Sequence, residues 1–256
     1  MKPFASISFG ILVVLFTGWP VLISGTRQQA RKPVPVVNTT PPPPAPAIAA
    51  PSPVALVEQE AYALYDSMKL RRAGLSKKAF LYAWKGYTKL IQKGVIRNDE
   101  VLSICDFSQS SRKKRMYIID VANKKLLMNT WVAHGRNSGG EYARSFSNKP
   151  ESHKSSLGFY LTRQEYYGEH GLSLKIDGIE QGINDKARAR NIVIHGSPYV
   201  GAGYLKSNRV SGRSFGCPAV PAKDSHKVIQ AIKGGTCLFI YHPSESYLSR
   251  SSILNG

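Results

Sequence analysis

The spacing of hydrophobic positions predicts two helices early in the chain. Between residues 56 and 94 apolar side chains recur at helical intervals, and Gly74 and Gly94 mark the expected helix ends. We interpret these side chains as a packing face rather than a ligand-binding surface; they are Leu56, Ala63, Leu64, Met68, Leu70, Leu75, Phe80, Ala83, Tyr87 and Leu90.

From residue 101 onward the apolar positions form short runs separated by turn-rich loops, which is the pattern of β-strands. The expected strands are 101–105, 116–121, 126–133, 157–163, 172–176, 191–195 and 236–241. A single late helix is predicted at 222–232. The pattern therefore predicts a mainly β fold, a sandwich or a partly closed barrel, preceded by a small N-terminal helical extension.

The sequence near the N-terminus predicts export. Residues 4–23 are apolar, follow Met1-Lys2, are broken at Trp19-Pro20 and precede several basic residues. A basic start with a short apolar run is typical of a signal peptide, whereas the length of this run approaches that of a membrane anchor. Both interpretations stay open, and either one predicts that the rest of the chain is exported to the periplasm or cell envelope.

Proline and alanine dominate the segment that follows. Residues 33–54 contain repeated prolines, which favour an extended polyproline-like spacer and exclude a sheet ladder. We interpret it as a tether, with a passive leader as the alternative. The expected division is a signal peptide or anchor (1–25), a Pro/Ala-rich linker (26–55), a helical extension (56–98), a β domain (99–243) and a C-terminal tail (244–256).

Composition narrows the class of partner. The 256 residues are 42% hydrophobic and 10% aromatic, which is enough for a packed core. The formal net charge of +19 indicates a polyanionic neighbour, such as nucleic acid, anionic lipid or an envelope polymer. The sequence has no zinc-finger spacing and no RNP-type aromatic motif, so we expect no nucleic-acid partner.

The chain has three cysteines, an odd number that favours one free, reactive thiol in an oxidising compartment. Cys105 and Cys237 lie in strand-like runs, and two separate buried thiols are favoured there over a disulfide. Cys217 instead lies in the glycine-flanked turn Gly-Arg-Ser-Phe-Gly-Cys-Pro-Ala-Val at 212–220. Such a turn exposes the sulfur, so Cys217 is the candidate nucleophile.

Two histidines are candidates for the base that deprotonates this thiol. His195 ends an apolar run and precedes Gly196, and His134 precedes Gly135 in a similar setting. A histidine can take the thiol proton and later return it to a leaving amine. The backbone amides at Gly216 and Cys217 are candidates for an oxyanion hole. These features predict a cysteine-dependent acyl-transfer enzyme, while periodicity alone does not choose between the two histidines.

The sequence around these residues resembles the L,D-transpeptidase (YkuD-like) superfamily. The matching motifs are His195-Gly196 and Ser214-Phe215-Gly216-Cys217, and 212–220 is similar to the Gly-Arg-Ser-x-Gly-Cys-Pro-Ala-Val of the murein branch. Residues 132–135, 146–148, 155–160 and 167–171 extend the resemblance over about 75–243. Phe215 replaces the second histidine of many members, and Pro218 replaces a polar or aliphatic residue.

The resemblance implies a YkuD-like fold, with 99–243 as the catalytic domain, and a peptidoglycan L,D-transpeptidase. Cys217 would attack the bond between the third residue of a stem peptide, a diamino acid, and the terminal D-alanine. A second stem's amine would then resolve the thioester into a 3→3 cross-link, and carbapenems would acylate the same cysteine. The alternatives are an L,D-carboxypeptidase or endopeptidase on the same scaffold and a non-catalytic wall-binding module.

The spacing of the superfamily motif favours His195 as the base. His134 is then expected to line the pocket or to orient the substrate, and a purely structural role for it is an equal alternative. Arg213 is a candidate for binding a peptide carboxylate. Ser214, Tyr160 and Ser156 are expected beside the substrate, and a polar loop at 137–148 is expected over the groove. With neither His-Glu-x-x-His nor Cys-x-x-Cys in the sequence, we expect no metal and no cofactor.

Overall fold

The structure is a computed structural model that describes residues 52–256. The predicted signal or anchor at 4–23 and most of the proline-rich spacer lie outside the described residues. No helix within residues 52–256 combines the length and hydrophobicity that a membrane crossing requires.

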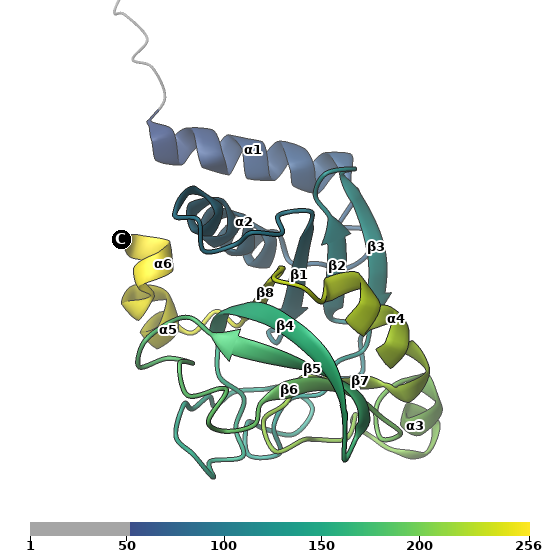
Figure 1. The fold of residues 1–256 in the computed structure, drawn as a ribbon. Coiled ribbons are helices and arrows are strands. Elements are labelled where there is room, and N and C mark those ends of the chain that lie inside the picture. Colours follow the sequence, from purple (N-terminus) through teal and green to yellow (C-terminus); the bar gives the residue numbers. More distant parts are fainter. Residues whose placement is uncertain (1–51) are drawn as a thin grey trace, which may run out of the picture. The chain divides into compact units, whose positions relative to one another are not determined.

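Eight strands form one sheet (Figure 1). Its spatial order is β3-β2-β1-β8-β4-β5-β6-β7; β1 pairs with β8 and β6 with β7 in parallel, and the other neighbours are antiparallel. The strands are β1 (Val101–Asp106), β2 (Met116–Asp120), β3 (Lys125–Thr130), β4 (Gly158–Gly168), β5 (Gly171–Gly178), β6 (Val193–Ser197), β7 (Ala219–Pro221) and β8 (Cys237–Tyr241).

The two edges of this sheet approach each other, because the chain leaving β3 returns to β7. Ala133 forms an antiparallel bridge with Ala219, whose carbonyl accepts its N–H at 2.8 Å, and Gly135 forms a parallel bridge with Ser214. The sheet is therefore a nearly closed barrel. The mainly β prediction is confirmed in its partly closed barrel form.

The helices before the barrel pack into the same hydrophobic core. Helix α1 (Pro53–Ser67) starts at Ser52, whose side chain caps it, and α2 (Lys77–Gln92) starts in the same way at Ser76. The buried face of α2 includes Phe80 and Tyr87, as the apolar spacing predicts. In Figure 1 α2 lies between α1 and the strands β1 and β8.

Gly86 allows this close approach of α2. A Cβ there would lie 2.0 Å from Cζ of Phe159, and the Phe159 ring stacks on Phe239 at 4.2 Å, so it has little room to move. Alanine gains about 1 kcal/mol over glycine in helix propensity, but overpacking a core costs about 1–3 kcal/mol. We expect Gly86→Ala to lower the free energy of unfolding by up to about 2 kcal/mol in urea titrations. Gly203→Ala is the control, because no atom lies within 4 Å of a Cβ at that helical glycine; an equal loss there would contradict this account.

Four further helices follow the barrel strands or end the chain. They are α3 (Ala202–Ser207), α4 (Ala222–Ile232), α5 (Glu245–Arg250) and α6 (Ser252–Asn255). The predicted helix at 222–232 coincides with α4, while α3, α5, α6 and the three-residue β7 were not predicted. Buried Glu180 accepts hydrogen bonds from the Tyr247 and Ser251 hydroxyls, which ties the C-terminal helices to the barrel.

Candidate active site

Cys217 lies at the end of the turn that leads into β7, beside the first residue of β6. The pairing of His195 with Ala219 places Cys217 level with Val193. The Val193 N–H donates to the Cys217 Sγ at 3.5 Å, which confirms this register. The thiol contacts the carbonyl oxygen of Asn191 at 3.7 Å on the other side. Backbone groups of the segment entering β6 therefore hold the sulfur.

The turn before Cys217 has a conformation that favours glycine. Gly216 has φ +126°, and a Cβ there would lie 2.9 Å from the Lys154 carbonyl oxygen. The Ser214 hydroxyl accepts the Gly216 N–H at 3.1 Å and donates to the Cys217 carbonyl at 2.6 Å. Ser214 thus fixes the turn that presents the sulfur, and the Gly216 amide already has a partner.

Burial raises the pKa of the Cys217 thiol above its ordinary value. Three groups lower this pKa by favouring the thiolate: the Val193 N–H, the Arg190 guanidinium and the Cys217 backbone N–H. Burial is the largest of these effects, so the resting group is a neutral thiol. A reaction at this sulfur therefore needs a base to remove the proton.

His195 has the properties of such a base. It is 3% exposed, and its Nδ1 lies 3.0 Å from the Gly196 carbonyl oxygen. Because a carbonyl only accepts, Nδ1 carries the proton and Nε2 keeps a free lone pair. Burial lowers the pKa of His195, and neighbouring His170 lowers it further. His195 is consequently neutral near pH 7, the state in which it can accept a proton.

The sheet places the thiol and this imidazole on one face. Val193 and His195 are two positions apart on β6, so their side chains point the same way, and Ile194 between them points into the core. Cys217 and Ala219, which lie beside Val193 and His195, are also two positions apart, so their side chains point to the same face. Within residues 52–256 no direct hydrogen bond joins Cys217 to His195. Catalytic hydrogen bonds often tighten only when substrate binds.

His134 has a different environment from His195. Arg115 Nη2 donates to its Nδ1 at 2.7 Å, so the proton is on Nε2, which faces the Gly139 carbonyl at 3.3 Å. Burial, followed by the charge of Arg115, lowers the pKa of His134 to about 4. Its side chain is fully buried and both ring nitrogens have partners. This geometry favours the structural role that the sequence left open.

Three further residues singled out from the sequence lie beneath or beside the turn. Tyr160 is 1% exposed and donates to the Ser156 carbonyl, and the Ser156 hydroxyl donates to the Ser147 carbonyl. Both side chains are buried, so they support the site from the protein interior rather than contacting the substrate. Arg213 is exposed and lines a hollow of about 300 Å³ together with Arg136 and Arg209.

Two residues near the site were missed by the sequence analysis. Arg190 donates to the Lys154 carbonyl at 2.6 Å and to the Ser156 hydroxyl at 2.7 Å, and it affects the Cys217 pKa. The ring of His170 stacks on that of His195 with centroids 4.3 Å apart. Arg190 belongs to a basic run typical of solvated surface, and His170 lies in a matched segment, 167–171, that suggested no role.

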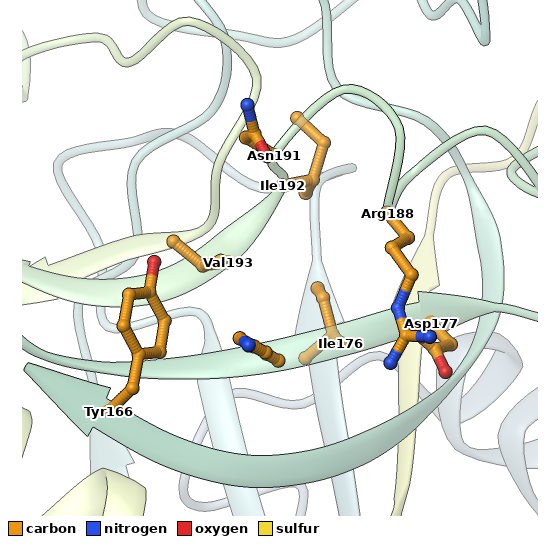
Figure 2. Close-up of a pocket in the computed structure, with 8 residues that line it drawn as sticks. Tyr166, Ile176, Asp177, Arg188, Asn191, Ile192 and Val193 are labelled. Atoms are coloured by element: carbon orange, nitrogen blue, oxygen red, sulfur yellow. Dashed lines mark ion pairs between the residues drawn. The ribbon is translucent and has the colours of Figure 1, made fainter. Parts of the chain in front are cut away.

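A hollow of about 230 Å³ opens next to the sulfur. Figure 2 shows Tyr166 and Val193 on one side and the ion pair of Arg188 with Asp177 on the other. Asn191 and Val193, whose backbone atoms contact the Cys217 Sγ, both line it. Asn191 and Val193 therefore contact the thiol and line the hollow.

Most of the described chain matches a known protein family. Residues 71–241 match the family described as L,D-transpeptidase catalytic domain, and the chain belongs to that family. No curated protein matches the chain.

Three solved structures are similar to part of this chain. An L,D-transpeptidase from Mycobacterium smegmatis is 10% identical, with TM-score 0.34, over 56% of this chain and 59% of the other. One from Mycobacterium tuberculosis H37Rv is 13% identical, with TM-score 0.31, over 56% and 58%. The helical cell shape determining protein Pgp2 from Campylobacter jejuni is 16% identical, with TM-score 0.33, over 57% and 48%. The chain thus spans less than two thirds of the length of these proteins.

Proposed function

We propose that this protein is a peptidoglycan L,D-transpeptidase that forms 3→3 cross-links through a thioester on Cys217. The observation that carries the proposal is the placement of Cys217 and His195 on one face of β6 and β7, in a chain of this family. The free Nε2 of His195 and the neutral thiol are the protonation states that general-base activation requires.

In the first half-reaction His195 Nε2 takes the thiol proton as Sγ attacks the carbonyl carbon between the diamino acid and D-alanine. The negative charge develops on the carbonyl oxygen, near the N–H groups that face the sulfur, those of Val193 and Cys217. The Gly216 N–H can join them only by leaving the Ser214 hydroxyl. When the carbon–nitrogen bond breaks, His195 returns the proton to the amine of D-alanine.

In the second half-reaction the side-chain amine of another stem attacks the thioester. His195 removes one amine proton, the carbon–sulfur bond breaks, and the thiol is regenerated with a new amide bond. Ser214 holds the nucleophile turn, and Arg213 faces a hollow suited to a stem carboxylate. His134, Tyr160 and Ser156 act by supporting the site from the protein interior.

Export of the catalytic domain to the cell envelope is part of the proposal, with residues 4–23 as a signal peptide or inner-membrane anchor. The chain divides functionally into that segment, a linker, a helical extension, the catalytic domain (99–243) and a C-terminal tail. The surplus of basic residues suits an anionic wall polymer.

Purified tetrapeptide muropeptides test the reaction. We expect cross-linked dimers and free D-alanine, measured by chromatography with mass detection, because an amine resolves the thioester. Tripeptide monomers without dimers would mean that water resolves it, and the protein would then be an L,D-carboxypeptidase. Binding to sacculi without any product would favour the wall-binding module.

A further inference from the structure

The ring of His170 covers one face of the His195 imidazole, and no part of the proposed mechanism uses it. The two ring centroids lie 4.3 Å apart and the ring planes meet at 25°, which is a stacked arrangement. His195 is 3% exposed, whereas His170 is exposed. His170 therefore lies on the solvent side of the candidate base.

The hairpin between β4 and β5 fixes the position of His170. The ladder pairs Gly168 with Gly171, so the turn has two residues, of which His170 is the second. Further along β5, Ser173 pairs with His195 on β6. Backbone pairing thus brings the turn close to the base, and the His170 side chain spans the remaining distance.

The His195 imidazole has no hydrogen-bonded side chain to orient it. Its Nδ1 contacts the carbonyl oxygen of Gly196, the next residue, and within residues 52–256 no carboxylate or amide side chain bonds to the ring. A base that serves a nucleophile is normally oriented by a third group. In this site the stacked ring of His170 is the side-chain contact that restricts how the imidazole turns.

We propose that His170 is a positioning residue that holds the His195 imidazole, by stacking on it, in the orientation that directs Nε2 toward the Cys217 thiol. The inference rests on the proposed function and deepens it, because it names what orients the base. Rotation about the Cβ–Cγ bond of His195 would swing Nε2 away from the thiol. A ring packed flat on the imidazole resists that rotation, and the energy of an aromatic pair corresponds to an effect of up to about tenfold.

Stacking also affects the protonation of the base, which gives a second readout. Burial lowers the pKa of His195, and the charge of His170 lowers it further. Loss of the His170 ring would admit water and remove that charge, so the pKa of His195 should rise toward 6.5.

The other elements packed against β6 do not provide this effect. The Cys217 thiol beside β7 does not act on the pKa of His195. Among residues 52–256, the other charged side chains of β5 and those of α4 do not act on it either; they are Lys175, Asp177, Lys223, Asp224, His226 and Lys227.

The test follows acylation of the full-length protein by a carbapenem, and release of D-alanine from tetrapeptide stems, from pH 5 to pH 10. We expect His170→Ala to lower the plateau rate of acylation about tenfold and to move the midpoint of the acid limb upward, toward 6.5. His170→Phe keeps a ring on His195, so it should retain most of the plateau rate. Its midpoint should stay close to that of the wild type, because burial is the larger cause of the shift.

Tyr167→Ala is the matched control, because Tyr167 is an exposed aromatic residue of the same hairpin. Its neighbour Tyr166 lines the hollow, so Tyr167 points to the opposite face of the strand. The control should leave the plateau rate and the midpoint unchanged.

Three results on folded protein would overturn the inference while the proposed function stands. The first is a His170→Ala profile equal to that of the wild type, and the second is an equal loss in His170→Ala and His170→Phe. The third is a lower plateau in His170→Ala with an unchanged midpoint, which a purely structural role would produce. A folded wild type that is not acylated and releases no D-alanine would instead contradict the proposed function itself.

Discussion

Cys217→Ala is expected to abolish both covalent adduct formation with a carbapenem and release of D-alanine. The Sγ is the atom that must form the thioester, and the backbone groups that hold it have no reactive substitute. Comparable removals of a covalent nucleophile cost on the order of 10⁶-fold in rate. Intact-mass spectrometry after incubation should show one adduct per wild-type chain and none on the variant.

The other two cysteines provide an internal control for this experiment. Cys105 and Cys237 remain in the Cys217→Ala protein, and both are fully buried free thiols. Burial raises the pKa of Cys105 to about 12 and that of Cys237 still higher, so neither forms a thiolate at neutral pH. An adduct that persists on a folded Cys217→Ala protein would show that the reactive residue is elsewhere. If the wild type forms no adduct, a non-catalytic wall-binding module becomes the favoured function.

The local parts of the fold could be predicted from the sequence, whereas the closure of the barrel could not. The helix at 222–232 and most strand positions follow from apolar spacing, because each reflects one buried face. The bridge between Ala133 and Ala219 joins positions far apart in the chain, and β7 has only three residues. Neither feature produces a periodic pattern of apolar residues in the sequence, because both depend on how the sheet curves to bring its edges together.

For the site, the sequence identifies residue types more reliably than their surroundings. Cys217 and His195 follow from their motifs, and the structure places them on one face. The two His-Gly motifs also have different hydrogen-bond partners, Arg115 for His134 and Gly196 for His195. No local sequence pattern predicts these partners.

The contrast between the two histidines also explains why a substitution at His195 should act on chemistry rather than on stability. Its one hydrogen-bond partner is the adjacent carbonyl, whereas His134 joins Arg115 to the loop at Gly139. We therefore expect His134→Gln to lower the unfolding midpoint more than His195→Gln does. A larger loss of stability at His195 would contradict this division of roles.

His195→Gln is expected to slow acylation of Cys217 about 10²–10⁴-fold, the usual contribution of a general base. Burial lowers the pKa of His195, so the neutral base persists below its ordinary value of 6.5. The wild-type acylation rate should accordingly fall on the acid side with a midpoint below 6.5. Because burial raises the thiol pKa above 9.0, the variant should instead gain rate with pH until the thiol ionises unaided.

Stopped-flow measurements with a carbapenem from pH 5 to pH 10 compare the two profiles. The same acid limb in both proteins would assign that proton to a group other than His195, and the neighbouring imidazole of His170 would be the next to replace.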